Sequence, residues 1–229
     1  MWNGRRTYTA AELRRIEQPL LAAGVPLMRR AAEALAARVS ALLRERGTPS
    51  GPVLLLVGGG DNGGDALYAG AELAASGVRV EVLRTASSVH ERALAAALEA
   101  GAALLPETAG AARLAGRAAA CALVVDGVLG LGAGGTAAGG SPALRGRARE
   151  IVAAVVRALE RTPGRRPTVV AVDLPSGVDP DSGEVAEPAA VLPADLTVTF
   201  IRVKHGLVRE PGARFAGRIE LETLGVDEG

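Results

Sequence analysis

The stretch that decides the fold reads Val53-Leu-Leu-Leu-Val57, followed by Gly58-Gly-Gly-Asp-Asn-Gly-Gly-Asp65. Five consecutive aliphatic residues are typical of a strand that is buried on both faces, as in a parallel sheet. The glycine-rich turn leads into a helix predicted from Gly64 to Ser76. Glycines let backbone N–H groups approach an anion at a helix N-terminus. This strand, turn and helix predict an α/β protein that binds a phosphate-bearing ligand.

Helices and strands alternate on both sides of this unit. Upstream, the periodicity predicts helices over 9–24 and 26–46. Downstream, it predicts helices over 87–100, 108–119 and 142–161, and strands over 78–83, 102–105, 123–125, 168–172, 196–200 and 218–221. This order favours a three-layer α/β/α Rossmann-like fold with a mostly parallel central sheet. We expect one domain over 1–229, with N-terminal helices in 9–46 and a Rossmann-like core in 53–222.

Composition excludes several classes of protein. The chain has 229 residues, 48% of them hydrophobic, and a formal net charge of +1. Arginine is scattered rather than clustered, so no nucleic acid partner is expected. No apolar run reaches the roughly 18 residues of a membrane span, and no signal peptide is recognisable. The single cysteine, Cys121, stands in an apolar run, so we expect a buried thiol and a cytoplasmic location.

Four loops follow predicted strands, and ligands bind beside the carboxyl ends of strands in an open parallel sheet. The first loop, 58–65, fits a dinucleotide-binding fingerprint, with Glu81 where a ribose-binding acid is expected. Asp61 and Asp65 would repel a pyrophosphate there unless a cation offset them. A tight turn with Asp as a helix cap is the alternative.

Two further loops each begin with an aspartate. Asp126 precedes a glycine-rich stretch that ends at Thr136 and offers N–H donors to a phosphate. Asp173 precedes a rigid turn that contains Ser176. If their strands are neighbours, Asp126 and Asp173 face the same cleft, which favours acid–base chemistry or a metal site. Alternatively, the glycine-rich stretch is a low-complexity connection and Asp173 caps a turn.

The fourth loop carries Lys204, the only lysine among 26 basic residues. On the rim of the expected crevice its ammonium could pair with a phosphate or with one of the acids. A plain surface lysine is the alternative. His205 beside it is expected to be structural or exposed, since two histidines make neither a catalytic triad nor a zinc site.

Taken in order, these motifs resemble the NAD(P)H-hydrate epimerase family, also described as the YjeF N-terminal domain. They are Asn62-Gly-Gly-Asp65 after an apolar strand, Asp126 before a glycine loop, Val172-Asp-Leu-Pro-Ser-Gly-Val-Asp179, and Thr197-Val-Thr-Phe200 before Lys204. Residues 17–32 are also similar to that family's opening helices. The resemblance covers roughly residues 8 to 225.

The resemblance implies an isomerase, usually dimeric, that interconverts the R and S forms of NADHX and NADPHX. These are hydrates that carry a hydroxyl at C6 of the nicotinamide ring. It also implies an ATP- or ADP-dependent dehydratase, on the same chain or a separate one, that restores NAD(P)H from the S form. A bound potassium ion is implied as well, with Asn62, Asp126 and Ser176 matching its ligands.

The resemblance further implies substrate contacts from both glycine loops and from Asp173. Asp173 is expected to exchange a proton with the C6 hydroxyl, and Lys204 to bind a phosphate or tune Asp173. The matching loop positions are Asp61, Asn62, Gly63, Gly64, Asp65, Gly130, Leu131, Gly132, Ala133, Gly134, Gly135 and Thr136. Asp61, Ala66 and Leu131 depart from the family pattern, which has Asn, Gly and Thr there.

Two other functions remain open. A nicotinamide-nucleotide-binding oxidoreductase would use the same first glycine loop, but it needs a second catalytic domain for which 229 residues leave little room. A non-catalytic scaffold or binding module of the same fold has no need of the carboxylates of Asp126 and Asp173, and both are present.

Overall fold

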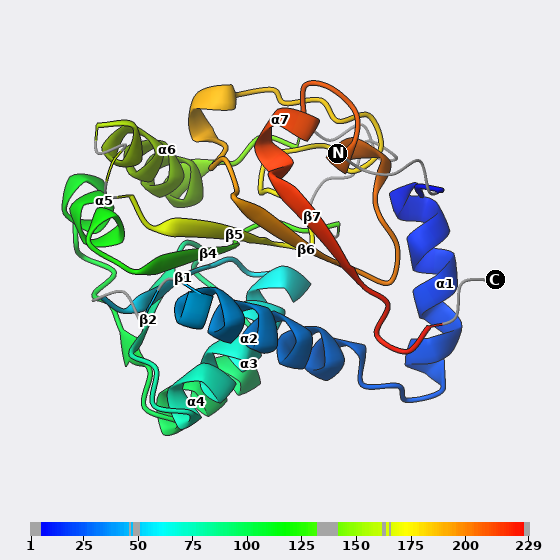
Figure 1. Cartoon of the computed structure of the whole chain (residues 1–229), viewed down its shortest axis with the longest axis horizontal. Coiled ribbons are helices and arrows are strands. Elements are labelled where there is room, and N and C mark those ends of the chain that lie inside the picture. Colours follow the sequence, from blue (N-terminus) through cyan, green and yellow to red (C-terminus); the bar gives the residue numbers. More distant parts are fainter. Residues whose placement is uncertain are drawn as a thin grey trace.

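A seven-stranded sheet forms the centre of the computed structural model, which describes residues 6–45, 47, 51–131, 142–161, 164 and 166–226. Every neighbouring pair of its strands is parallel, in the order β3-β2-β1-β4-β5-β6-β7 (Figure 1). The strands are β1 (Val53–Val57), β2 (Val80–Arg84), β3 (Ala103–Leu104), β4 (Leu123–Gly127), β5 (Thr168–Val172), β6 (Leu196–Phe200) and β7 (Arg218–Glu222). The predicted three-layer α/β fold is confirmed, and the sheet is parallel throughout.

Helices cover both faces of the sheet (Figure 1). One face carries α2 (Leu27–Glu45), α3 (Asp61–Ala75) and α4 (Glu91–Glu99), and the other carries α5 (Ala111–Ala119) and α6 (Gly146–Glu160). At one end of the molecule lies α1 (Ala10–Ala22). Three short elements, η2 (Pro188–Ala190), η3 (His205–Leu207) and α7 (Ala213–Ala216), occupy the connections on either side of β6.

The aliphatic side chains of β1 pack into the hydrophobic cores on both faces of the sheet. Val53, Leu55 and Val57 pack toward α2 and α3, whereas Leu54 and Leu56 pack toward α5 and α6. All five side chains are fully buried. Burial of such a side chain stabilises a fold by about 1.5–3 kcal/mol. A strand with no polar face therefore has to lie in the middle of a three-layer structure.

A capping box begins α1. Thr9 accepts a hydrogen bond from the backbone N–H of Glu12, and the Glu12 carboxylate accepts one from the backbone N–H of Thr9. Just before the helix, the Tyr8 N–H donates to the Val203 carbonyl over 2.9 Å, and the His205 N–H donates to the Tyr8 carbonyl over 3.0 Å. These bonds fix the N-terminal segment beside the loop that follows β6.

Four predicted helix starts are wrong, one of them that of α5, which begins at Ala111 after Gly110 rather than at Thr108. Helix α3 begins at Asp61 rather than Gly64, because Gly60 adopts an extended N-cap conformation. Residues 61–65 are therefore the first turn of a helix and not a loop. Helix α4 begins after His90, whose Nδ1 accepts from the Ala93 N–H, and neither Ser87 nor Ser88 caps it. Helix α6 begins at Gly146, four residues after the predicted start.

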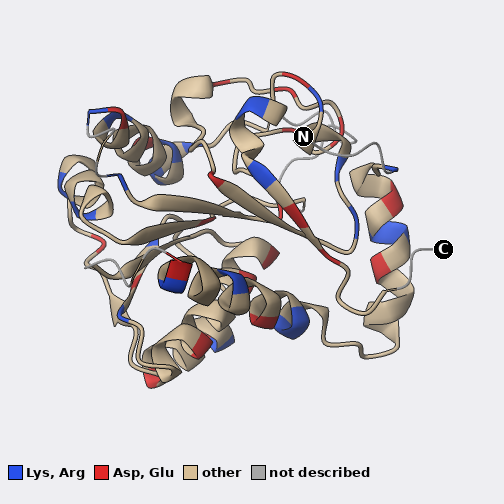
Figure 2. Cartoon of the chain, in the orientation of Figure 1, with Lys and Arg blue, Asp and Glu red and all other residues tan. Residues whose placement is uncertain are grey.

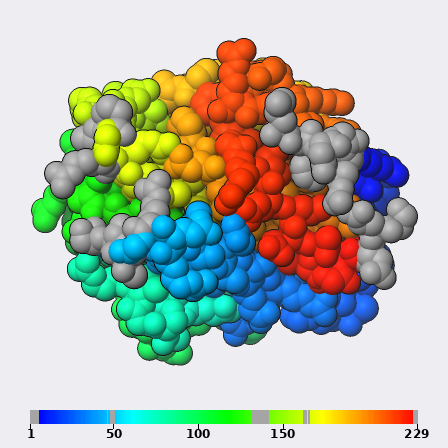
Figure 3. Space-filling view, viewed as in Figure 1, coloured from blue at the N-terminus to red at the C-terminus, as the bar shows by residue number. Residues whose placement is uncertain are grey.

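The surface mixes both signs of charge. Lys and Arg alternate with Asp and Glu along the helices in Figure 2, and Cys121 is buried as predicted. Figure 3 shows α2 beside the C-terminal segment on one face, where Arg38 donates to Glu220 of β7 over 2.8 Å. Among the described helices, none is long and apolar enough to cross a membrane.

The order of the strands reverses between β1 and β4. In a doubly wound sheet this is where ligands bind, beside the carboxyl ends of the strands. Here the Gly58 N–H donates to the Gly127 carbonyl over 3.0 Å. A Cβ on Gly58 would lie 1.8 Å from the Val128 carbonyl oxygen, so this close approach requires glycine.

Candidate active site

A cavity of about 500 Å³ opens at the carboxyl ends of β1, β4, β5 and β6. Helices α1 and α2 wall it on one side through Leu21, Leu27 and Met28. Four of its lining residues are acids, and among the described lining residues none is Lys or Arg. We call it the acidic cavity, after Glu17, Asp61, Asp65 and Asp173.

Asp173 is held in an unusual backbone conformation directly after β5. Its φ is 67°, and Ile201, directly after β6, has a φ of 62°. Such conformations cost about 1–3 kcal/mol in residues other than glycine and cluster at functional sites. The Asp173 N–H donates to the Val198 carbonyl over 2.8 Å, which anchors the strained residue to the neighbouring strand. In this conformation the carboxylate lies at the wall of the acidic cavity.

Every donor that the structure gives to the Asp173 carboxylate binds the same oxygen. Oδ1 accepts from the Phe200 N–H over 3.0 Å, from the Thr199 hydroxyl over 3.2 Å and from the ammonium of Lys204. Because these groups occupy Oδ1, Oδ2 is the oxygen that remains for a ligand in the cavity. The carboxylate is thus fixed in position through one of its two oxygens.

Lys204 is buried rather than on the rim of the crevice, with 1% of its surface exposed. Its Nζ donates to Asp173, to the Phe200 carbonyl over 3.0 Å and to the Thr199 hydroxyl over 3.1 Å. The predicted rim position is wrong, because the ammonium is bonded to the buried Asp173 and Thr199, while the backbone of Lys204 forms a bridge with Tyr8 of the N-terminal segment. Of the two predicted partners, phosphate and acid, the lysine contacts the acid.

Two further acids of the cavity have perturbed protonation. Burial raises the pKa of Asp65 well above its ordinary range, and the nearby charges of Asp173 and Asp61 raise it further. Burial also raises the pKa of Glu17 on α1. Both carboxyls therefore hold their protons to a higher pH than exposed ones do.

The three predicted potassium ligands are linked by hydrogen bonds, Asp126 to Ser176 directly and Ser176 to Asn62 through the Leu129 carbonyl. Asp126 accepts from the Ser176 N–H over 2.9 Å and from its hydroxyl over 2.6 Å. The Leu129 carbonyl oxygen lies 3.3 Å from the Ser176 Oγ and 3.4 Å from the Asn62 Nδ2, which also donates to the Val172 carbonyl over 2.6 Å. Strand neighbours thus bring Asn62, Asp126 and Ser176 together.

Asp126 does not face the cleft as the sequence predicted. It is 1% exposed and is absent from the described lining of the acidic cavity. Asp126 lies within β4, which ends one residue later at Gly127. Its side chain is bonded to Ser176, beneath the loop that follows β4. Burial raises the pKa of this carboxyl, against the lowering effect of the Ser176 hydrogen bonds. Asp173 is therefore the one of the two aspartates that lines the acidic cavity.

The predicted substrate residues divide into three groups. Gly63 and Gly64 do not line the acidic cavity, because they pack against the Gly58 carbonyl and against Met28. Gly132, Ala133, Gly134, Gly135 and Thr136 lie outside the described residues. The residues that do line the cavity are Asp61, Asn62, Asp65, Gly130, Leu131 and Asp173.

Sequence reasoning missed some residues and misplaced another. Glu17 and Ile201 line the cavity, but a lone acid on an amphipathic helix and an isoleucine after a strand give no signal in a sequence. The prediction for Glu81 is wrong. It lies in the first half of β2, away from the carboxyl end, and forms an ion pair with Arg117 of α5. His205 is structural, since Thr7 and its Nδ1 lie 2.6 Å apart.

This arrangement defines a Rossmann-like α/β protein whose acid-lined site lies at the switch point of a parallel sheet. The sequence matches the family described as YjeF-related protein N-terminus over residues 24–206, and the chain belongs to that family. Its fold is similar to the crystal structure of the yeast protein ynu0, with a TM-score of 0.72 and 19% identity, over 91% of this chain and 86% of that one.

Curated relatives carry names that describe an activity. The NAD(P)H-hydrate epimerase of Clavibacter sepedonicus is 52% identical over 96% of this chain and 90% of its own length. That of Microbacterium testaceum is 46% identical over 96% of this chain and 78% of its own length. The bifunctional NAD(P)H-hydrate repair enzyme Nnr of Mycobacterium tuberculosis is 37% identical over 97% of this chain, which spans 42% of that protein.

Proposed function

We infer that this chain is an NAD(P)H-hydrate epimerase, an isomerase that interconverts the R and S forms of NADHX and NADPHX. The names of the relatives that match almost its whole length support this function. The structural observation that carries it is the Asp173 carboxylate, fixed through Oδ1 at the wall of an acid-lined cavity and with Oδ2 available to a ligand.

The chemistry follows from the hydrate itself. When the C6 hydroxyl takes up a proton, it leaves as water, and the lone pair of the ring nitrogen forms a double bond to C6. Water then returns to the opposite face of the cation and gives up a proton. Asp173 Oδ2 exchanges a proton with the hydroxyl and the water, and positioned acid–base help of this kind is worth about 10²–10⁴-fold in rate.

The other acids act on the charge of the intermediate. Loss of water from the protonated hydroxyl leaves a cation, and the ionised carboxylates of the acidic cavity stabilise this positive charge, which exists only during the reaction. The raised pKa of Asp65 lets it keep a proton at higher pH than an ordinary aspartate, so it can donate one. Lys204 positions Asp173 through their buried ion pair.

A potassium ion is the proposed cofactor. Asn62, Asp126 and Ser176 are buried, and the oxygens of Asp126, Ser176 and the Leu129 carbonyl are the hard donors that such a cation prefers. Asn62 turns its Nδ2 to the Leu129 carbonyl and would offer its Oδ1 after a flip of the amide. Only one of these groups is a carboxylate, which suits a monovalent ion. When bound, the ion would supply positive charge beside the first glycine loop. Potassium chloride is expected to raise the melting temperature above that in choline chloride, and Ser176→Ala to abolish the difference.

The pathway partner is proposed to be a dehydratase that uses ATP or ADP and consumes the S form. The bifunctional relatives, of which this chain matches 42%, support a link between two repair activities. We also propose a homodimer, as the family resemblance implies. Sedimentation of the purified chain measures its mass in solution and decides between monomer and dimer.

Substitution of Asp173 tests the proposed function. Asp173→Asn keeps the size of the side chain but removes the base, so exchange between the epimers should slow about 10²–10⁴-fold. Epimerisation is measured by adding a dehydratase to a mixture of both forms, since full conversion needs the epimerase. Glu187→Gln is the matched control, because Glu187 is partly exposed and pairs with Arg149 away from the cavity. An unchanged exchange rate in Asp173→Asn would contradict the assignment.

A further inference from the structure

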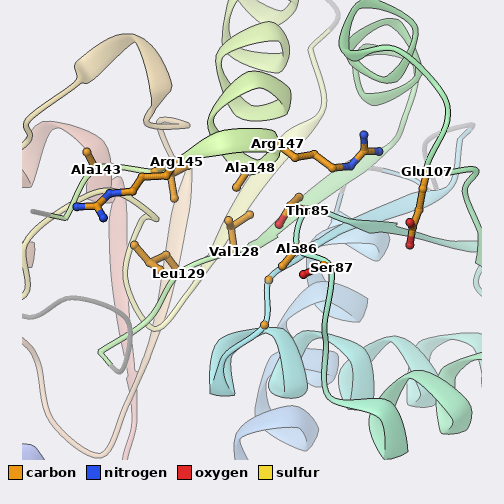
Figure 4. A pocket seen from close by; sticks show the side chains of 13 residues that line it. Thr85, Ala86, Ser87, Glu107, Val128, Leu129, Ala143, Arg145, Arg147 and Ala148 are labelled. Atoms are coloured by element: carbon orange, nitrogen blue, oxygen red, sulfur yellow. The ribbon is translucent and has the colours of Figure 1, made fainter.

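A second cavity, of about 690 Å³, lies on the side of the sheet that α6 covers. Figure 4 shows it between the end of β2, the loop after β4 and the start of α6. Its polar lining side chains are Thr85, Ser87, Glu107, Arg145 and Arg147. We call it the arginine cavity.

The two cavities meet at the switch point. Gly59, Val128 and Leu129 line both of them. The acidic cavity lies on the α2 side and the arginine cavity on the α6 side, so a long ligand could cross the edge of the sheet between them. Dinucleotides bind across this crevice in doubly wound folds.

The charges of the two cavities differ in sign. A pyrophosphate or a phosphate would find no cationic side chain among the described lining of the acidic cavity and would be repelled by its ionised carboxylates. The arginine cavity carries two guanidinium groups, Arg145 and Arg147, which extend in opposite directions from the start of α6 in Figure 4. Its one acid, Glu107, is already paired with Arg84 at 3.2 Å. The anionic part of a substrate therefore belongs in the arginine cavity.

Arg147 has an N–H donor near the carboxyl end of β2 that the described residues leave without a partner. Its Nη2 is buried and has no hydrogen-bond partner among the described residues. Its Nε lies 3.5 Å from the Arg84 carbonyl, which puts the guanidinium at the carboxyl end of β2. Dinucleotide folds read the 2′ position of the adenosine ribose near this point, with an acid for a hydroxyl or an arginine for a phosphate. Here β2 ends at Arg84, and Thr85 follows it.

We propose that the arginine cavity binds the adenosine half of the substrate and that Arg147 selects its 2′-phosphate, so that the enzyme acts on NADPHX in preference to NADHX. This inference rests on the proposed function and extends it to the form of the substrate. Ala86, Val128 and Ala148 offer small apolar surfaces on which the adenine can lie (Figure 4).

Binding of the adenosine half alone tests the cavity without any catalysis. Titration calorimetry compares adenosine 2′,5′-bisphosphate with adenosine 5′-monophosphate. We expect the bisphosphate to bind about ten- to a hundredfold more tightly, as one charge-assisted contact provides. Arg147→Gln should abolish this preference, and Arg147→Lys should restore part of it. Arg149→Gln, on the exposed face of the same helix, should leave it unchanged.

A second test measures the rates of epimerisation of NADPHX and NADHX. The ratio of kcat/KM for NADPHX to that for NADHX should exceed one and fall about ten- to a hundredfold in Arg147→Gln, with most of the change in KM. Equal binding of the two adenosine nucleotides, or an unaltered ratio in a folded Arg147→Gln protein, would overturn the inference. Failure of the proposed function looks different, because neither hydrate would then be epimerised while the bisphosphate still binds through Arg147.

Discussion

At the scale of single residues, the centre of the site is an ion pair taken out of water. Lys204 and Asp173 are both nearly fully buried, and the hydroxyl of Thr199 and the carbonyl of Phe200 satisfy the rest of the ammonium. A buried pair adds little net stability, because both charges lose their hydration. Its value here is positional, since it directs one carboxylate oxygen toward the cavity.

Removal of one member of the pair should therefore cost more than the pair contributes. Lys204→Met leaves the Asp173 carboxylate buried without its counter-charge, and we expect a loss of about 3–5 kcal/mol in the free energy of unfolding. Urea denaturation measures it. Arg214→Gln breaks an exposed pair with Glu210 and should change that energy by less than about 0.5 kcal/mol. Similar losses in the two variants would refute this view of the site.

At the scale of elements, the glycines of the first loop serve packing as well as ligand approach. Helix α3 leaves the end of β1 so sharply that its first turn lies directly on Gly58. A Cβ on Gly63 would lie 2.2 Å from the Gly58 carbonyl oxygen, although Gly63 has ordinary helical geometry. Some glycines of this loop are therefore required by the close approach of the helix to the strand rather than by a ligand.

Two helical glycines should respond to alanine in opposite directions. Gly63→Ala forces the backbone apart and should destabilise the fold by about 1–3 kcal/mol. A Cβ on Gly116, inside α5, would meet nothing within 4 Å, so Gly116→Ala should stabilise the fold by about 0.5–1 kcal/mol through helix propensity. Thermal unfolding of both variants against the parent protein gives the two signs, and a shift of the same sign would exclude this explanation.

At the scale of the whole molecule, several buried acids with raised pKa values lie near the carboxyl ends of the strands. Burial raises the pKa of Asp65, Glu17 and Asp126. In the unfolded chain these carboxyls titrate near pH 4. Above that pH the folded protein holds protons that the unfolded chain has lost, so stability falls as the pH rises toward the folded pKa values.

Asp65→Asn should weaken this pH dependence. The amide cannot ionise, so the free energy of unfolding should fall less between pH 5 and pH 8 in the variant than in the parent protein. Guanidinium denaturation at the two pH values measures the difference. Glu187 is partly exposed and its pKa is lowered by Arg149, so Glu187→Gln should leave the slope in this range unchanged. An equal slope in Asp65→Asn would mean that Asp65 is charged throughout.

The sequence by itself determined the architecture, because hydrophobic periodicity and strand length are local properties. The run Val53–Val57 has no polar face, which by itself requires layers on both sides. It also determined the order of the motifs and which strand ends carry aspartates. Asn62, Asp126 and Ser176 could be grouped in advance through the resemblance, since their motifs follow neighbouring strands.

Only the tertiary structure decided what each side chain faces. Asp126 and Asp173 both follow strands, yet one turns under the loop to Ser176 and the other is held at the cavity by a positive φ. Lys204 is buried against Asp173, which precedes it by 31 residues, and its backbone forms a bridge with Tyr8 at the other end of the chain. The arginine cavity is lined by residues from the end of β2 and from the start of α6. Such contacts depend on long-range packing energies, which no local pattern of residues encodes.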